Sequence, residues 1–259
     1  MSVYLHEKVE YLASALETLM AQTIPADEVI LVEDGPISPK MAQVISSYRE
    51  ALNIVSIPLA VNVGLARALN AGLDRCGHEL VVRMDADDLA MPDRIELQLA
   101  YMALNPDVAA SSGRIEEFNE DGPKSSYRVL PTQHEELVRL AKRRSPLSHP
   151  AVIFRKSIIK SVGGYPDIYP EDYMLWILLI LNGCRLGNVS ETIIRMRIND
   201  AILKRRGLKM LKGELKIHTF MRGKKMLGTV EFLGIVFLKT VLRLVPGFLK
   251  TFFYKAARG

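Results

Sequence analysis

The chain has 259 residues, a formal net charge of +5, 49% hydrophobic residues and 24% charged residues, which suits one large domain with an appendage or two small domains. Its two cysteines, Cys76 and Cys184, lie far apart without a C-x-x-C spacing, which excludes a disulfide framework and a cysteine-rich zinc site. No apolar run reaches the roughly 18 to 20 residues of a membrane span, and the N-terminus lacks the pattern of a secretion signal. We therefore expect a cytoplasmic protein.

Helical and extended segments alternate over the first 111 residues. The apolar patterns predict strands at 2–4, 28–32, 54–57, 80–82 and 108–111. The intervening segments have helical spacing and predict helices at 9–20, 39–51, 62–76 and 92–104. This order predicts a mostly parallel, twisted α/β sheet flanked by helices.

The first predicted strand, residues 2–4, is shorter than a usual strand of about 5 to 6 residues. We expect a weakened sheet edge here. About five apolar residues added before it are expected to raise thermal stability.

Three carboxylates directly follow the apolar run 80–82. Because Asp85 and Asp87 are separated by Ala86, an extended backbone would point both to one side, where they can share a hard divalent cation. Such a cation could hold a diphosphate at the carboxyl end of the strand. The alternative is that these acidic residues cap the next helix and are solvated.

The later chain is less regular. Residues 114–145 are polar and contain a predicted helix at 134–144, and a strand is predicted at 151–154. Glu171 and Asp172 then open a strongly apolar helix. Since the backbone dipole favours carboxylates in a first turn, capping is one interpretation of this acidic pair.

Together these segments resemble a family-2 glycosyltransferase, a nucleotide-sugar enzyme of the GT-A fold. The matching motifs occur in the family's order within residues 1–200, which we interpret as the catalytic domain, and look most like the branch that builds bacterial cell-surface polysaccharides. They are Glu33-Asp34-Gly35, Asn62-Val63-Gly64-Leu65-Ala66-Arg67-Ala68-Leu69-Asn70, Met84-Asp85-Ala86-Asp87-Asp88, Pro92-Asp93-Arg94, His149-Pro150, Val162-Gly163-Gly164-Tyr165 and Glu171-Asp172-Tyr173-Met174-Leu175-Trp176.

The resemblance implies a role for each matching polar residue. Asp34 would bind the nucleotide base, Arg67 would approach the nucleotide or its phosphates, and Asp85 would face the ribose. Asp87 would bind Mn²⁺ or Mg²⁺, which bridges the diphosphate. Asp172 would be the general base that removes the proton of the acceptor hydroxyl.

Other residues have two interpretations. Glu171 and Asp88 are secondary candidates, Glu171 for an acceptor hydroxyl, and His149 would bind phosphate or acceptor or act as a structural hydrogen-bonding group. Arg67 is alternatively a solvated surface charge. Trp176, inside an apolar helix, is better explained by core packing than by sugar stacking.

The implied function is inverting transfer of a sugar from a nucleotide-diphosphate donor, with UDP-sugar favoured, to a hydroxyl of a lipid-linked saccharide. One alternative is a sugar-phosphate nucleotidyltransferase, although the chain lacks the Gly-rich, basic phosphate loop with which that class usually opens. Another is a non-catalytic nucleotide- or nucleic-acid-binding module attracted by basic charge. We expect no nucleic-acid partner, because no recognised nucleic-acid motif is present.

The basic charge is concentrated in residues 201–259, with 14 lysines and arginines against 2 acidic residues, whereas the preceding 200 residues have 20 basic and 27 acidic side chains. Dense apolar residues at 229–255, interrupted by cations such as Lys239, predict amphipathic helices at the inner face of an anionic membrane. Pro246-Gly247 would divide them. The alternatives are that these helices cover the catalytic domain or form a dimer seam.

Overall fold

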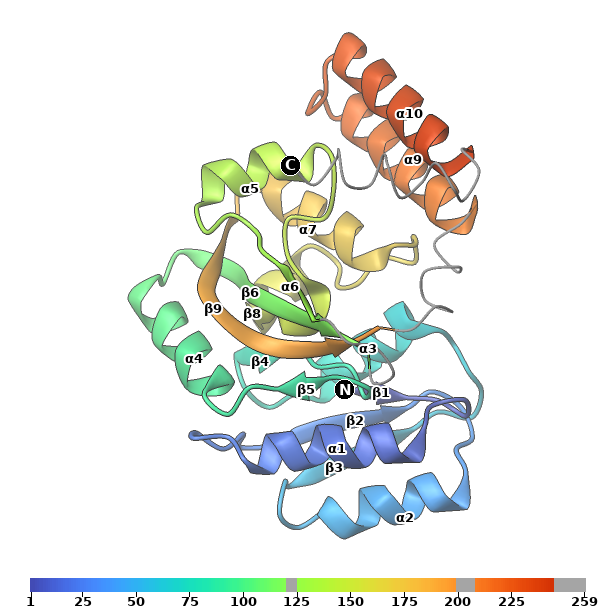
Figure 1. Ribbon diagram of the computed structural model, residues 1–259, viewed down its shortest axis with the longest axis vertical. Coiled ribbons are helices and arrows are strands. Elements are labelled where there is room, and N and C mark those ends of the chain that lie inside the picture. Colours follow the sequence, from blue (N-terminus) through green and yellow to red (C-terminus); the bar gives the residue numbers. More distant parts are fainter. Residues whose placement is uncertain (120–124, 199–207, 245–259) are drawn as a thin grey trace.

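The computed structural model describes residues 1–119, 125–198 and 208–244. Figure 1 shows two sheets with helices packed around them and a helical pair, α9 and α10, at one end. The C-terminal predictions for residues 245–259, including the break at Pro246-Gly247, lie outside the described residues.

The first sheet contains three parallel strands in the order β1-β2-β3. They are β1 (Ser2–Val3), β2 (Val29–Glu33) and β3 (Ile54–Pro58), and the helices between them are α1 (Val9–Met20), α2 (Pro39–Tyr48) and α3 (Leu65–Arg75). Leu31 packs in the same buried cluster as Leu16 of α1 and Met41 of α2. Gly72 of α3 lies against Val32, on the opposite face of β2. Helices therefore cover both faces, as the alternating pattern predicts.

The second sheet has the order β4-β8-β6-β9-β5, and β7 pairs with the edge of β6. Its strands are β4 (Leu80–Val82), β5 (Leu89–Ala90), β6 (Val108–Phe118), β7 (Ser126–Arg128), β8 (Ile153–Arg155) and β9 (Arg185–Arg197). Only β6 and β9 are parallel, and the other ladders are antiparallel. Parallel pairing thus holds for the first sheet, while the second is mixed.

The long strand β9 is the main element that the sequence patterns do not predict. It contains Gly187, Asn188, Ser190 and Glu191, residue types that are neutral or unfavourable in strands. The strand forms because it pairs along most of β6 and holds β5 on its other side. Pairing with a distant segment therefore overrides local propensity.

The remaining helices lie around the second sheet, except for α9 and α10, which lie beyond α7 (Figure 1). They are α4 (Arg94–Leu104), α5 (His134–Ala141), the 3-10 helix η1 (His149–Ala151), α6 (Lys156–Ser161), α7 (Glu171–Leu181), α9 (Leu208–Gly223) and α10 (Thr229–Leu244). The strand predicted at 151–154 begins later, because His149–Ala151 forms a 3-10 turn before β8. The helix predicted at 39–51 ends at Tyr48, because the chain turns before β3.

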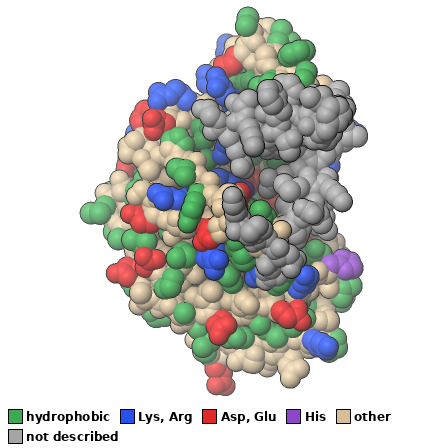
Figure 2. All heavy atoms as spheres, in the orientation of Figure 1, with side chains coloured by type: hydrophobic (Ala, Val, Ile, Leu, Met, Phe, Trp, Pro, Cys, Tyr) green, Lys and Arg blue, Asp and Glu red, His purple; other side chains and the backbone are tan. Residues whose placement is uncertain are grey.

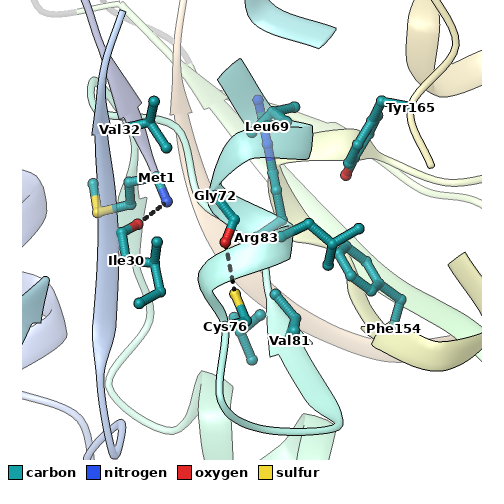
Figure 3. A pocket seen from close by; sticks show the side chains of 12 residues that line it. Met1, Ile30, Val32, Leu69, Gly72, Cys76, Val81, Arg83, Phe154 and Tyr165 are labelled. Carbon is teal, nitrogen blue, oxygen red and sulfur yellow. Dashed lines mark hydrogen bonds between the residues drawn. The ribbon is translucent and has the colours of Figure 1, made fainter. Parts of the chain in front are cut away.

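A cavity lies where the two sheets approach each other, between β2, α3 and β4 (Figure 3). Its lining includes Ile30, Val32, Val81 and Arg83. The short first strand is observed here, with two residues paired to β2, and the Met1 amine donates to the Ile30 carbonyl at 2.8 Å. That added residues would stabilise this edge stays a prediction.

The α9–α10 pair packs on the rest of the chain through residues of both helices. Ile217 and Met221 of α9 share a buried cluster with Tyr173 and Ile177 of α7. Helix α9 of the basic segment therefore packs against α7, in agreement with the alternative that this segment covers the rest of the chain. Among the helices that the structure describes, none combines the length and apolar character required to span a lipid bilayer.

Candidate active site

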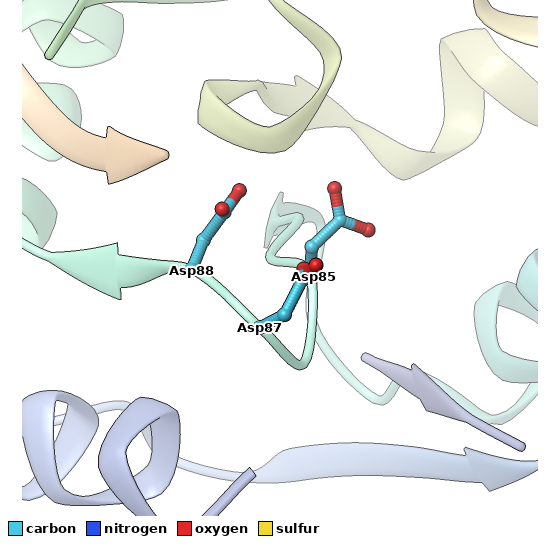
Figure 4. A group of neighbouring side chains, drawn as sticks. All are labelled: Asp85, Asp87 and Asp88. Atoms are coloured by element: carbon cyan, nitrogen blue, oxygen red, sulfur yellow. The ribbon is translucent and has the colours of Figure 1, made fainter. Parts of the chain in front are cut away.

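Three carboxylates gather on the loop that joins β4 to β5. Asp85, Asp87 and Asp88 each offer an oxygen within 4.8 Å of the others. Figure 4 shows that all three project from this one loop. Oxygen ligands at this spacing suit one hard divalent cation, so the structure brings together the residues that the sequence pattern singled out.

The surroundings of these carboxylates fit a cation. Asp88 is 1% exposed, its Oδ1 accepts a hydrogen bond from the Arg197 amide at 3.0 Å, and its Oδ2 has no partner among the described residues. Burial raises the pKa of Asp88 well above its ordinary value and, together with the charge of Asp85, raises the pKa of Asp87 to about 6. A divalent cation would supply the missing partner, which makes Asp88 a candidate ligand beside Asp87.

Two further residues near this loop, Arg83 and Glu7, were not predicted from the sequence. Arg83 is buried and forms a bidentate ion pair with Asp85, with Nη1 at 2.6 Å from Oδ2. The alternation of an extended chain, which places residues 83 and 85 on one side, could have indicated this pair. Glu7 follows β1, and burial and the charge of Asp87 raise its pKa to about 7. Glu7 is thus a fourth carboxylate close enough to influence the cluster.

Helix α4 connects the loop that carries Asp85, Asp87 and Asp88, here called the acidic loop, to the His149-Pro150 segment through hydrogen bonds. Arg94 is fully buried, and its Nη2 donates to the carbonyls of Arg83 at 2.6 Å and Pro150 at 3.2 Å. Its Nε donates to Gln98, which in turn donates to the Ala151 carbonyl at 2.8 Å. Burial and the charge of Arg83 lower the pKa of Arg94 to about 9. The arginine of the Pro92-Asp93-Arg94 motif therefore positions two loops of the site.

We expect Arg94→Ala to lower the free energy of unfolding by about 3 to 5 kcal/mol, because it leaves two buried carbonyls without their donor and opens a cavity. Urea unfolding followed by circular dichroism measures this change. Arg143→Ala is the matched control, since Arg143 is exposed, and should change stability by less than about 0.5 kcal/mol. Equal effects of the two substitutions would contradict the positioning role.

His149 is held by a chain of contacts from α3. Asn70 clamps the backbone of Tyr165, donating to its carbonyl and accepting from its amide, both at 2.8 Å. The Tyr165 hydroxyl then lies 3.2 Å from His149 Nε2. A Cβ on Gly164 would lie 2.5 Å from the Asn70 side chain, so this clamp requires glycine. Burial and the charge of Arg83 lower the pKa of His149 well below its usual value, which keeps the ring neutral.

Glu171 and Asp172 occupy the first turn of α7. Asp172 Oδ2 accepts a hydrogen bond from Ser145 Oγ at 3.3 Å. Burial raises the pKa of both acids. The charge of Arg83 acts on both, as it does on Asp87 and Asp88. Arg83 is therefore an electrostatic neighbour both of these two acids and of the carboxylates on the β4–β5 loop.

Asp34 and Arg67 lie at the β2 end of the site. The Asp34 carboxylate accepts from the amides of Val63 at 2.7 Å and Gly64 at 3.1 Å, and so shapes the turn before α3. Arg67 is exposed and forms an ion pair with Asp167 at 2.7 Å. The sequence analysis did not identify Asp167. Arg67 thus has a surface ion pair, and its approach to a nucleotide stays a prediction.

The raised pKa of Asp87 leads to a prediction about the pH dependence of stability in the metal-free protein, which is measured in EDTA. Its folded-state pKa of about 6 exceeds that of an unfolded Asp, so the folded state retains the proton at low pH and carries a buried charge as pH rises above 6. We expect Asp87→Asn to stabilise the metal-free protein, and to do so more at pH 7.5 than at pH 5. Thermal unfolding of both proteins at each pH tests this. His149 and His218 have lowered pKa values, so their contribution to stability increases with pH, opposite to that of Asp87. This contribution is present in both the wild type and Asp87→Asn, so it cancels in the difference between them. A gain that is larger at pH 5 would contradict the prediction.

Comparisons with known proteins agree with this arrangement. Residues 3–163 match the family described as Glycosyl transferase family 2. The chain is 36% identical over 259 residues to the amylovoran biosynthesis glycosyltransferase AmsE of Erwinia amylovora, which covers 99% of this chain and 97% of that protein. It is 35% identical over 258 residues to an Escherichia coli UDP-Gal:alpha-D-GlcNAc-diphosphoundecaprenol beta-1,3-galactosyltransferase, which covers 98% of this chain and 94% of that protein.

Solved structures share the fold. Residues 1–349 of Staphylococcus aureus TarS in complex with UDP superpose with a TM-score of 0.65 at 19% identity, over 91% of this chain and 68% of that one. The mannosyltransferase PcManGT of Pyrobaculum calidifontis, in complex with GDP-Man and Mn²⁺, gives a TM-score of 0.66 at 16% identity, over 94% of this chain and 69% of that one.

These likenesses confirm the predicted GT-A fold and the resemblance to enzymes of cell-surface polysaccharide synthesis. They favour glycosyl transfer over the nucleotidyltransferase and the non-catalytic module. With the family matched over residues 3–163 and relatives aligned along nearly the whole chain, the chain belongs to glycosyl transferase family 2 and is a glycosyltransferase.

Proposed function

We propose that this glycosyltransferase moves a sugar from a UDP-sugar to a hydroxyl of a lipid-linked saccharide, with inversion at the anomeric carbon and with the aid of a divalent cation. The observation that carries the proposal is the cluster of Asp85, Asp87 and Asp88, in which one buried oxygen has no partner among the described residues. The E. coli relative is named for a UDP-galactose donor and a diphosphoundecaprenol-linked acceptor, which supports the same classes of donor and acceptor here.

Asp87 and Asp88 would hold Mn²⁺ or Mg²⁺. When bound, the ion supplies positive charge that stabilises a departing nucleoside diphosphate. The Mn²⁺ complex of PcManGT supports a cation in this fold. We assign Asp34 and Arg67 to the nucleotide and Asp85 to its ribose, with Arg83 keeping the Asp85 carboxylate in place.

Asp172 is the proposed general base. It would take the proton from the acceptor hydroxyl while that oxygen forms its bond to the sugar C1 and the bond from C1 to the diphosphate oxygen breaks. One direct displacement of this kind inverts the anomeric centre. Burial, which raises the pKa of Asp172, brings its basicity nearer to the working pH. Glu171 and the neutral His149 would orient the acceptor beside it.

We also propose that residues 1–200 form the catalytic unit and residues 201–259 a C-terminal helical extension. The enzyme would act in the cytoplasm at the inner face of the plasma membrane, where a lipid-linked acceptor can be reached. The packing of α9 on α7 supports an extension docked on the catalytic unit.

A donor panel tests the proposed reaction. UDP- and GDP-sugars are incubated with Mn²⁺, Mg²⁺ or EDTA and a short-chain lipid diphosphate saccharide, and the product is analysed by mass spectrometry and by NMR of the new anomeric proton. We expect transfer from one UDP-sugar, only with a cation, and a product of inverted configuration. Retention of configuration would show that the transfer is not inverting. Full activity in EDTA would show that the reaction does not need a divalent cation.

A further inference from the structure

Helix α10 has described charged side chains that pair with other parts of the chain, and several of its apolar side chains are exposed to solvent. Its described side chains include only two charged residues, and both are paired inward. Glu231 lies 3.4 Å from Lys142 beyond α5, and Lys239 lies 2.7 Å from the buried Glu214 of α9. The sequence analysis placed Lys239 among the cations of the membrane-facing surface. The structure corrects this, because Lys239 is used to hold α10 against α9.

The outward face of α10 is an apolar stripe. We define this stripe as Val230, Leu233, Phe237 and Leu238, which are 86%, 59%, 72% and 57% exposed. Their spacing places them on one side of the helix. Figure 2 shows hydrophobic side chains exposed at the upper end of the molecule, where α10 lies in Figure 1. An exposed stripe of this size on a helix that is fixed by inward ion pairs indicates a binding surface.

The helical pair that carries the stripe also has many exposed lysines. Five lysines of α9 and the following turn are exposed, namely Lys209, Lys212, Lys216, Lys224 and Lys225. The two acidic residues of the pair are the buried Glu214, paired with Lys239, and the partly exposed Glu231, paired with Lys142. The described part of the pair therefore offers positive charge and apolar area with no exposed free carboxylate.

We propose that the apolar stripe of α10 inserts into the surface of an anionic bilayer while these lysines contact lipid headgroups. The inference rests on the proposed function in one respect, since the bilayer is where a lipid-linked acceptor would be met. Apolar burial in the bilayer and attraction of lysines to an anionic surface would both favour binding. A second copy of the chain fits this surface less well, because a symmetric seam would bring two sets of lysines together without carboxylates to pair with them.

Vesicle flotation with the full-length protein tests the proposal. We expect the wild type to float with vesicles of phosphatidylcholine and phosphatidylglycerol, and less with phosphatidylcholine alone or at high salt. Leu233→Asp combined with Phe237→Asp should weaken partitioning on the order of tenfold or more, because it places two charges in the inserted face. The control, Leu104→Asp combined with Val129→Asp, changes two exposed apolar residues elsewhere and should float as the wild type does.

Two further measurements separate the possible outcomes. Transfer to a water-soluble acceptor analogue should be unchanged in the α10 variant, so a failure of the proposed reaction is seen independently of flotation. Light scattering after size exclusion gives the oligomeric state. Equal flotation of the wild type and the α10 variant, or no flotation of the wild type, would overturn the proposal. If the wild type is a dimer, the α10 variant is a monomer and the two float equally, the stripe would instead be the contact surface for a second copy of the chain.

Discussion

Replacing Asp172 with asparagine is expected to lower kcat for sugar transfer by about 10²- to 10⁴-fold while nucleotide affinity stays near that of the wild type. Asparagine keeps the size of the side chain and an oxygen that can accept from Ser145, so this hydrogen bond at the start of α7 is retained. Only the ability to accept a proton is lost. Steady-state transfer assays and calorimetric titration with UDP measure the two quantities.

The neighbouring acid supplies the matched control for Asp172. Glu171→Gln removes a carboxylate of similar burial and similarly raised pKa from the preceding position of the same helical turn. If Asp172 is the base, Glu171→Gln should reduce kcat far less. The assignment would be wrong if the two substitutions had equal effects, or if Asp172→Asn lost nucleotide affinity in parallel with kcat, because a capping residue would behave in that way.

Replacing Asp87 with asparagine is expected to weaken Mn²⁺-dependent UDP binding on the order of a hundredfold, because a neutral amide cannot neutralise the cation that holds the diphosphate. Titration of UDP in Mn²⁺ and in EDTA separates the metal-dependent part of the affinity. Asp88→Asn should act in the same direction, since its Oδ2 is the buried oxygen without a partner among the described residues.

Asp93→Asn is the control for the acidic loop. Asp93 lies close by in sequence, at the start of α4, and is exposed, so it tests the effect of removing a negative charge from this end of the protein. UDP binding should stay within about twofold of the wild type, as expected for a screened surface charge. Asp87→Asn and Asp93→Asn with equal affinities would show that Asp87 does not hold the cation.

Much of the fold could be predicted because its signals are local. Apolar runs such as Leu80–Val82, helical spacing between Val9 and Met20, and glycine turns all arise within one segment and do not depend on the rest of the chain. The acidic loop could be found for the same reason, since Asp85, Asp87 and Asp88 are close in sequence. Strand β9 could not, because its stability comes from pairing with β6, a strand that begins at Val108, whereas β9 begins at Arg185.

The amino-acid sequence by itself determined the order of the elements, the motifs that identify the family, and the acidic residues on which the proposed chemistry depends. Only the tertiary structure decided which arginines support those acids and which way the charges of α10 point. Arg83, Arg94 and Lys239 look like ordinary surface cations in the sequence, yet each is buried or paired by contacts with other segments. A charged side chain is stable in such a place only when distant parts of the chain supply its partners, and that pairing is a property of the folded molecule.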